Sequence, residues 1–279
     1  MGRLNEIMIE DFKTYLVSEE KSEATIEKYI RDINIFFSFI KEREFVKTDV
    51  IEYKARLAES YAPTSVNSIL SSLNALFAFL GWHEMKVKTL KIQRQVFISR
   101  EKELTKNEYE RLLSASKSKG NERLYYLMQA VCSTGIRVSE IRFITVEAIK
   151  RECAEVNNKG KMRKVYLPRS LCKVLLDYCR RQKISSGYVF RTKNGNPLDR
   201  SNIWSEMKKL CIVAKVSEKK VFPHNLRHLF AKTYYSLQKD IVRLADILGH
   251  SSINTTRIYT AESGEVHHRQ IQKLGLLRC

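Results

Sequence analysis

Four short segments in the second half of the chain combine arginine, histidine and tyrosine side chains that could together handle a phosphate ester. Taken singly, each segment has an ordinary structural explanation: a helix connection with an exposed arginine, solvated helical side chains, a glycine-stopped helix end, and a half-buried tyrosine. A single His-x-x-Arg spacing is a weak signal, although residues three apart project from one face of a helix. The candidate side chains are, in chain order, Arg137, His224, Arg227, His250 and Tyr259.

Breaking a phosphodiester requires a nucleophile, a proton for the leaving oxygen and positive charge around the non-bridging oxygens. Arginine suits the last task, because its planar guanidinium binds two phosphate oxygens as a fork and keeps its charge at any relevant pH. A phenol can serve as the nucleophile, but it is protonated at neutral pH and needs a nearby base. The cysteines and histidines show no metal-ligand spacing, so we expect side chains to supply the positive charge, with no metal and no cofactor.

The order and spacing of the four segments are far more specific than any one of them. The His-x-x-Arg pair follows the first arginine by about ninety residues, and the tyrosine lies nine residues after the histidine of a Gly-His pair. With the wording PHNLRH and LGHSSINTTRIYT, the chain closely resembles the tyrosine recombinases, in particular their simple Xer-type and integrase branch. The resemblance covers essentially the whole chain and is strongest over residues 131–145 and 220–262.

The resemblance implies site-specific recombination of DNA and a role for each residue. Tyr259 would attack phosphorus and form a 3′-phosphotyrosine bond, while His224 accepts the phenolic proton. Because the covalent link conserves the bond energy, religation would need no ATP. Glu140, one helical turn after the first arginine, would orient the site. The phosphate would be held by Arg137, Arg227 and His250.

The family also places a lysine on a β-hairpin between the first arginine and the His-x-x-Arg pair. The segment NKGKMR occupies that position here, and Lys159 precedes a glycine as in the family's Lys-Gly turn. The resemblance therefore implies that Lys159 protonates the departing 5′ oxygen. The turn is about one residue shorter than the commonest family version, so Lys161 is the alternative proton donor. Lys161 and Arg163 are also expected to contact DNA.

The charge of the chain favours a polyanionic partner. The net charge is +19 and the pI is near 9.7, which points first to nucleic acid and second to an anionic membrane surface. Residues 1–100 carry 15 basic and 14 acidic side chains, whereas residues 101–279 carry 35 and 17. No apolar stretch approaches the roughly 20 residues needed to span a bilayer, which favours DNA. The six cysteines show no C-x-x-C pair, so we expect reduced thiols in a cytoplasmic, nucleoid-associated protein.

Residues 1–85 are predicted to form a bundle of four helices. Apolar residues recur at three- and four-residue steps along its longer helices, and by resemblance the bundle is the SAM-like core-binding domain that presses on one side of DNA. A basic linker, 86–103, lacks that periodicity. The expected helices cover residues 7–18, 26–40, 48–60 and 65–80. The linker residues expected to contact DNA are Lys86, Lys88, Lys91 and Arg94.

Residues 104–279 are predicted to form a catalytic domain, mostly helical with a small β-sheet, which makes the whole chain mainly α. A capping box from Thr105 to Glu108 opens its first helix. Val156 and Val165–Leu167 flank a polar turn as in a hairpin, and Tyr188–Phe190 is another possible strand. The expected helices cover 105–116, 121–133, 138–149, 169–181, 200–214, 225–238 and 240–248.

Family members work as tetramers on two DNA duplexes, so the resemblance implies a homotetramer on DNA and a monomer off it. The tail, 261–279, is apolar enough to pack on a neighbouring protomer or to fold back on its own domain. Two other functions are compatible with much of the pattern: DNA relaxation by a type IB topoisomerase, and DNA binding by a regulator that has lost catalysis. The target site and the biological role are left open by the sequence.

Overall fold

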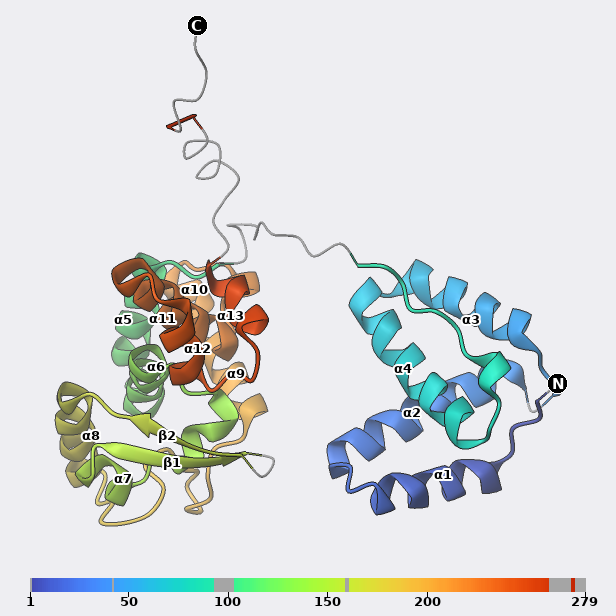
Figure 1. Cartoon of the computed structure of the whole chain (residues 1–279). Coiled ribbons are helices and arrows are strands. Elements are labelled where there is room, and N and C mark those ends of the chain that lie inside the picture. Colours follow the sequence, from blue (N-terminus) through green and yellow to red (C-terminus); the bar gives the residue numbers. More distant parts are fainter. Residues whose placement is uncertain (1, 42, 93–102, 159–160, 261–271, 274–279) are drawn as a thin grey trace, which may run out of the picture. The chain divides into compact units, whose positions relative to one another are not determined.

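The computed structural model describes the chain except for residues 1, 42, 93–102, 159–160, 261–271 and 274–279 (Figure 1). Two compact units follow one another along the chain, residues 1–94 and residues 95–279. Both are built mainly from helices, and the described residues contain a single two-stranded sheet. The predicted fold class is therefore confirmed. Among the described residues, no helix is long and apolar enough to cross a membrane.

The four predicted helices of the N-terminal unit are present. Local chemistry favours their starts: the Asn5 side chain accepts the Met8 amide before α1, and Pro63 occupies the first turn of α4. Phe12, Phe36 and Phe77 are fully buried in the core between the helices. The elements are α1 Glu6–Ser18, α2 Glu23–Ile40, α3 Lys47–Ser60, α4 Pro63–Phe79 and the short 3₁₀ turn η1 His83–Met85.

A buried carboxylate joins α2 to α4 inside this bundle. Asp32 is only 3% exposed, and it accepts hydrogen bonds from Lys28 and Ser72, each at 2.9 Å. A charge can stay buried only when it is paired and hydrogen-bonded in this way. The contact therefore specifies how the two helices are aligned.

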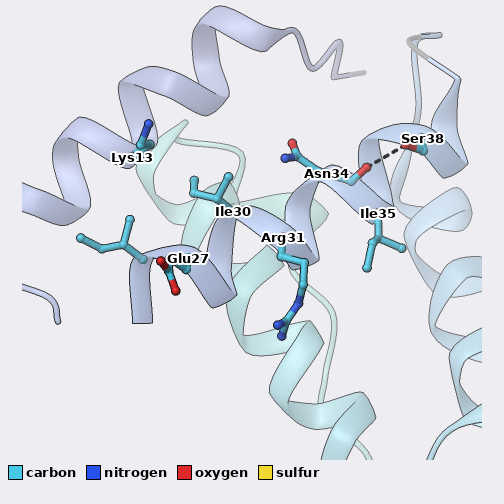
Figure 2. A pocket seen from close by; sticks show the side chains of 8 residues that line it. Lys13, Glu27, Ile30, Arg31, Asn34, Ile35 and Ser38 are labelled. Atoms are coloured by element: carbon cyan, nitrogen blue, oxygen red, sulfur yellow. Dashed lines mark hydrogen bonds between the residues drawn. The ribbon is translucent and has the colours of Figure 1, made fainter. Parts of the chain in front are cut away.

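A depression on the surface of the N-terminal unit lies between α1 and α2 (Figure 2). Lys13 reaches it from α1, whereas Glu27, Ile30, Arg31 and Ile35 line it from α2. Its lining mixes both signs of charge with apolar side chains and includes none of the residues predicted to do chemistry. The candidate chemistry must therefore be sought in the C-terminal unit.

The first residues of the predicted linker pack against the N-terminal unit. The side-chain amide of Asn74 bonds both the N–H and the carbonyl of Val87, and Asn67 bonds Leu90 in the same paired manner. Val87 is buried, and the Lys54 ammonium donates to the Lys88 carbonyl at 2.7 Å. Two asparagines thus give this segment the partners that a neighbouring strand would supply.

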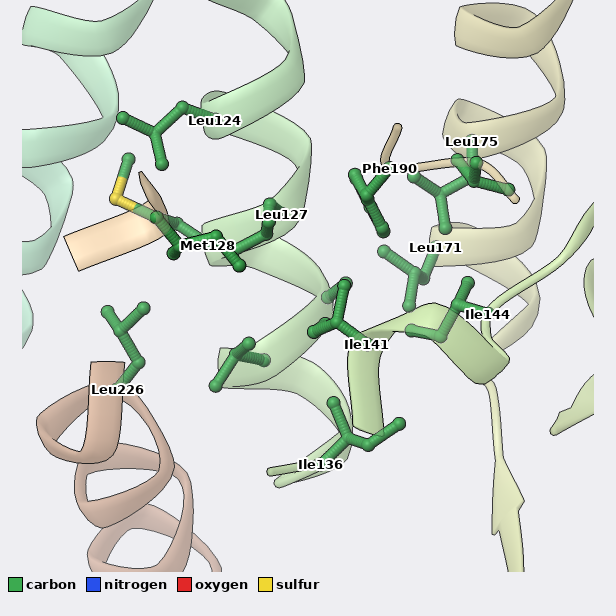
Figure 3. Close-up of a cluster of buried hydrophobic side chains, with 14 of the residues drawn as sticks. Leu124, Leu127, Met128, Ile136, Ile141, Ile144, Leu171, Leu175, Phe190 and Leu226 are labelled. Atoms are coloured by element: carbon green, nitrogen blue, oxygen red, sulfur yellow. The ribbon is translucent and has the colours of Figure 1, made fainter. Parts of the chain in front are cut away.

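The C-terminal unit packs its longer helices around one core that includes Leu127 and Met128 of α6, Leu171 and Leu175 of α8, and Leu226 of α11 (Figure 3). The predicted capping box of Thr105 and Glu108 is present at the start of α5. The helices are α5 Lys106–Ser118, α6 Glu122–Thr134, η3 Val138–Phe143, α7 Val146–Lys150, α8 Arg169–Arg181, α9 Arg200–Lys208, α10 Cys211–Ala214, η4 Glu218–Lys220, α11 Pro223–Gln238, α12 Ile241–Leu248 and α13 Ile253–Thr260.

Three elements predicted in this unit differ in the structure. The helix predicted over 138–149 is two pieces, because Ile144 is extended and the Thr145 side chain caps a new helix by accepting the Ala148 amide. The helix predicted over 200–214 ends at Lys208 and is followed by the four-residue α10. Tyr188–Phe190 makes only an isolated bridge, Tyr188 with Thr145, rather than a strand.

The predicted hairpin is longer than the sequence indicated. Strands β1 (Cys153–Asn158) and β2 (Lys161–Tyr166) pair antiparallel, with Asn158 opposite Lys161. They extend through most of the polar segment that was predicted as a turn. The reason is that a two-stranded sheet buries one face only, so its polar residues alternate with buried ones such as Val156 and Val165.

Candidate active site

Arg137 is positioned by the connection between α6 and η3. α6 ends at Gly135, which adopts a left-handed conformation with φ of +65°. A Cβ on this residue would lie 2.5 Å from Phe230, so only glycine fits. Two residues later, the Arg137 guanidinium pairs with Glu140 at 3.0 Å and donates to the Gly249 carbonyl at 3.2 Å.

Arg227 and His224 project from the first turns of α11. Arg227 is 2% exposed, and its guanidinium donates to the carbonyls of Gly135 at 2.6 Å and Leu248 at 2.7 Å. Burial, reinforced by the neighbouring Arg137, lowers the pKa of Arg227 to about 10. The guanidinium is therefore still charged at neutral pH, and it remains an electrostatic partner for an anion.

His250 lies in the turn between α12 and α13. Gly249 ends α12 with φ of +63°, and the His250 N–H donates a hydrogen bond to the Ala245 carbonyl at 3.0 Å. The His250 Nε2 is 2.9 Å from an Arg227 Nη2, and Nδ1 is 2.8 Å from the buried hydroxyl of Thr256. Because arginine only donates, Nε2 must accept and Nδ1 must carry the proton.

The electrostatics of the site keep its histidines neutral. Burial and the charges of Arg227, Arg137 and Arg163 lower the pKa of His250 to about 4. Burial also lowers the pKa of His224, with Arg227, Arg200 and Arg137 adding to the effect. A neutral imidazole can accept a proton, so His224 is in the form that a general base requires.

Tyr259 ends up beside these groups, on α13. Its side chain is 3% exposed and packs with Ala231, Leu244 and Leu248. Three imidazole rings surround the phenol ring: the centroid distances are 6.3 Å to His224, 5.8 Å to His250 and 4.6 Å to His228. The nucleophile predicted from the sequence therefore lies beside the predicted base.

His228 was not among the residues that the sequence singled out. It forms the shortest ring contact with Tyr259, edge to face, and burial lowers its pKa to about 4. It lies within the same PHNLRH segment, four residues after His224, which is the spacing of one helix face. This spacing from His224 is the sequence signal that could have pointed to His228.

Glu140 is the buried carboxylate of the site. It is 1% exposed, and its carboxylate binds the Arg137 amide at 3.0 Å and the Arg163 guanidinium at 2.6 Å. Burial by itself would raise the pKa of Glu140, but these hydrogen bonds and the two positive charges lower it. The carboxylate therefore stays ionised and binds two guanidiniums at once, one on each oxygen.

The predicted site residues meet different outcomes. The side chains that gather in one place are those of Arg137, Glu140, His224, Arg227, His250 and Tyr259. Lys159 and Arg94 lie outside the described residues, and of Lys161 only the backbone is described. Arg163 points into the site rather than to solvent, and Lys86, Lys88 and Lys91 belong to the N-terminal unit.

The comparisons with known proteins agree with this geometry. Residues 9–84 match the "Phage integrase, N-terminal SAM-like domain" and residues 102–265 match the "Phage integrase family". The chain is 31% identical to "Tyrosine recombinase XerA" of Pyrococcus furiosus, over 97% of this chain and 94% of that protein. The chain belongs to the phage integrase family. It is a tyrosine recombinase of the Xer type, an enzyme of site-specific recombination.

More distant relatives and solved structures agree. "Tyrosine recombinase XerD" of Vibrio cholerae is 27% identical, over 86% of each chain. A crystal structure of XerA recombinase is similar with a TM-score of 0.54 at 25% identity, covering 97% of this chain and 98% of that one. A lambda integrase dimer bound to a COC′ core site gives a TM-score of 0.76 at 18% identity, covering 93% and 96%, and so shows that the recombinase has the same fold.

Proposed function

We propose that this recombinase cuts a DNA strand by attack of Tyr259 on a phosphodiester and rejoins strands through a 3′-phosphotyrosine intermediate. One observation carries the proposal: Arg137, Arg227 and His250, which are far apart in sequence, converge beside Tyr259 and His224. This arrangement of side chains fits phosphoryl transfer, because that reaction needs cations, a base and a nucleophile at one point.

In the proposed reaction, a phosphate bridges the two guanidiniums that now bind backbone carbonyls. An ionised phosphate oxygen is a stronger acceptor than a carbonyl, so we expect Arg137 and Arg227 to exchange their backbone carbonyls for it. Each preorganised donor of this kind stabilises a transition state by roughly 2.7–4 kcal/mol. The two arginines thus supply the positive charge that a metal ion supplies in other phosphoryl-transfer enzymes.

The bonds and protons balance as follows. The Tyr259 oxygen forms a bond to phosphorus while the bond from phosphorus to the 5′ oxygen breaks. His224 takes the phenolic proton, and Lys159 gives a proton to the departing 5′ oxygen. One phosphoester replaces another, so the reverse attack by a 5′ hydroxyl from a second duplex completes the exchange without ATP.

The burial of Tyr259 bears on when this reaction starts. A phenol that is 3% exposed cannot reach a phosphate on the surface of the domain unless α13 shifts. Binding of DNA supplies a reason for that shift, because Arg227, which also interacts with the Tyr259 side chain, turns to the phosphate and leaves the phenol. The nucleophile would then be uncovered only on a bound duplex.

Double-stranded DNA is the proposed partner. The basic excess lies almost entirely in residues 101–279, and phosphate contacts of this kind give affinity with steep salt dependence. Similar folds have been solved as a lambda integrase dimer on a core site and a tetramer on a Holliday junction. We extend this to a homotetramer on two duplexes that acts at the nucleoid, with Lys86, Lys88, Lys91, Arg94 and Lys161 among the DNA contacts.

The decisive experiment compares two single-atom changes. Tyr259→Phe should abolish covalent protein–DNA adducts on a nicked suicide substrate and leave DNA affinity within about twofold. Tyr234→Phe, in the same apolar cluster, is the matched control and should form adducts normally. Adducts in the Tyr259→Phe protein would disprove the nucleophile assignment.

The type IB topoisomerase reaction is separated by a second assay. A recombinase should require its recombination site, whereas a topoisomerase relaxes supercoiled plasmid that lacks one. Efficient relaxation of such a plasmid by the wild-type protein, without products of exchange, would contradict the proposal. A regulator without catalysis would give neither product and no adduct.

A further inference from the structure

Arg163 lies where the hairpin pattern calls for an apolar residue. On the same strand, β2, the even-numbered residues Met162 and Tyr166 are 72% and 75% exposed, whereas Val165, two residues after Arg163, is buried. Alternation along a strand places Arg163 on the buried face with Val165, and its side chain is only 17% exposed. An arginine is rarely found in such a place without a partner that requires it.

The partners of Arg163 come from two other elements. One terminal nitrogen donates to the Glu140 carboxylate at 2.6 Å, and the other donates to the Ile247 carbonyl at 3.1 Å. Its stem crosses directly over Gly249, where a Cβ would lie 2.4 Å from the Arg163 Cδ. The residue is thus closely packed between η3 and the end of α12, and both ends of its fork are occupied.

The end of α12 shows what this contact does. Three successive carbonyls, at residues 247, 248 and 249, each accept a hydrogen bond from a different guanidinium: Arg163, Arg227 and Arg137. The last carbonyls of a helix have no partner within the helix and attract cations. The turn that carries His250 is therefore held by three arginines at once.

We propose that Arg163 is the positioning residue that keeps this turn in place when a phosphate takes Arg137 and Arg227 away from their carbonyls. The inference depends on the function proposed above, because that function makes two of the three arginines phosphate ligands. Arg163 is not free to follow them, since it is nearly buried and bound to Glu140. It would thus hold His250 and the hairpin in one arrangement through the reaction, instead of contacting DNA itself.

The test separates positioning from charge. Arg163→Met keeps most of the stem over Gly249 and removes the fork, while Lys164→Met, next along the strand and exposed, loses the same charge from the surface. We expect single-turnover cleavage at saturating protein to fall roughly 10²-fold for Arg163→Met, because misplacement by about 1 Å costs that much. Lys164→Met should cleave within about twofold of wild type. Equal rates for the two variants would overturn the proposal.

Two further measurements keep the result interpretable. Arg163→Lys retains the charge and the stem but cannot form both bonds of the fork, so it should recover roughly tenfold of the lost rate. A wild-type rate for Arg163→Lys would show that the fork is not needed. This variant also decides the matter if Arg163→Met fails to fold, since we then expect Arg163→Lys to cleave about tenfold more slowly than wild type.

Hydrogen exchange reads the anchor without any chemistry. In a Tyr259→Phe background bound to DNA, Arg163→Lys should speed exchange of the His250 amide at least tenfold, whereas Lys164→Met should leave it unchanged. Unchanged exchange of the His250 amide in the Arg163→Lys protein would refute the proposal that Arg163 holds this turn, whatever the cleavage rates are. Absence of Tyr259 adducts in wild type, with exchange behaving as expected, would instead refute the proposed function.

Discussion

A methyl group at Gly135 should damage both the stability and the chemistry of the C-terminal unit, for reasons that can be separated. Gly135→Ala places a side chain at φ of +65° and a Cβ within 2.5 Å of Phe230 and 2.9 Å of Leu248. The left-handed conformation costs about 1–2 kcal/mol for a residue other than glycine. Overpacking of a close-packed site adds about 1–3 kcal/mol, so the whole change should cost roughly 2–5 kcal/mol.

Gly120→Ala is the matched control for the conformational part. Gly120 has φ of +67°, nearly the same as Gly135, but a Cβ there meets nothing within 4 Å. For a domain of this size, each kcal/mol lowers the melting temperature by about 2–4 °C. We therefore expect the melting temperature to fall by roughly 2–8 °C for Gly120→Ala and by roughly 4–20 °C for Gly135→Ala. Differential scanning calorimetry of the full chain measures both.

The same pair of variants tests whether the turn at Gly135 positions Arg227. The Gly135 carbonyl accepts a hydrogen bond from the Arg227 guanidinium at 2.6 Å, so displacement of Phe230 or of the turn would move the proposed phosphate ligand. At a temperature where both variants are folded, Gly135→Ala should cleave a suicide substrate at least tenfold more slowly than Gly120→Ala. If the two variants melt together and cleave alike, the packing argument is wrong.

Two other outcomes follow from the site. Lys159→Ala should slow cleavage far more than Lys161→Ala, and a substrate whose 5′ oxygen is replaced by sulfur, a better leaving group, should restore most of the Lys159→Ala rate; the reverse ranking would transfer the proton donor to Lys161. Because His228 and His250 have pKa values of about 4 in the folded protein and near 6.5 when unfolded, the unfolded chain binds more protons between these values. The free energy of unfolding should therefore fall as the pH is lowered from 6.5 to about 4. His228→Gln should make that fall smaller when the free energy is measured by urea unfolding; the same pH dependence in the variant would contradict the lowered pKa of His228.

The parts of the fold that the sequence predicts are those with a strong period. The long helices of both units show apolar residues on one face, and a capping box and a proline mark two of their starts. The break at Ile144 was missed because apolar residues at 138, 141 and 144 suit an α-helix as well as a 3₁₀ turn followed by an extended residue. Periodicity does not separate these cases, and the capping side chain of Thr145 decides between them.

The candidate site was predictable through its order of motifs and not through its contacts. The resemblance points to Arg137, His224, Arg227, His250 and Tyr259, but it says nothing about what each side chain touches. Besides its side-chain partner, each of the three arginines of the site binds a backbone carbonyl, which every residue possesses, so that contact leaves no trace in residue types. Arg163 was placed with the DNA contacts because an arginine on a polar hairpin is expected to face solvent, and only the fold brings Glu140 beside it.

The arrangement also explains how one histidine can serve a site that is crowded with positive charge. Burial and then three guanidiniums lower the pKa of His250, and in the free protein its Nε2 accepts from Arg227 rather than donating. A bound phosphate brings negative charge to the same point, and opposite charge favours the protonated form of an imidazole. In the proposed reaction Arg227 turns to the phosphate, so that Nε2 loses its donor and can take up a proton from solvent and donate it to the anion. The substrate would thereby convert His250 from an acceptor into a donor as charge on the phosphate begins to grow.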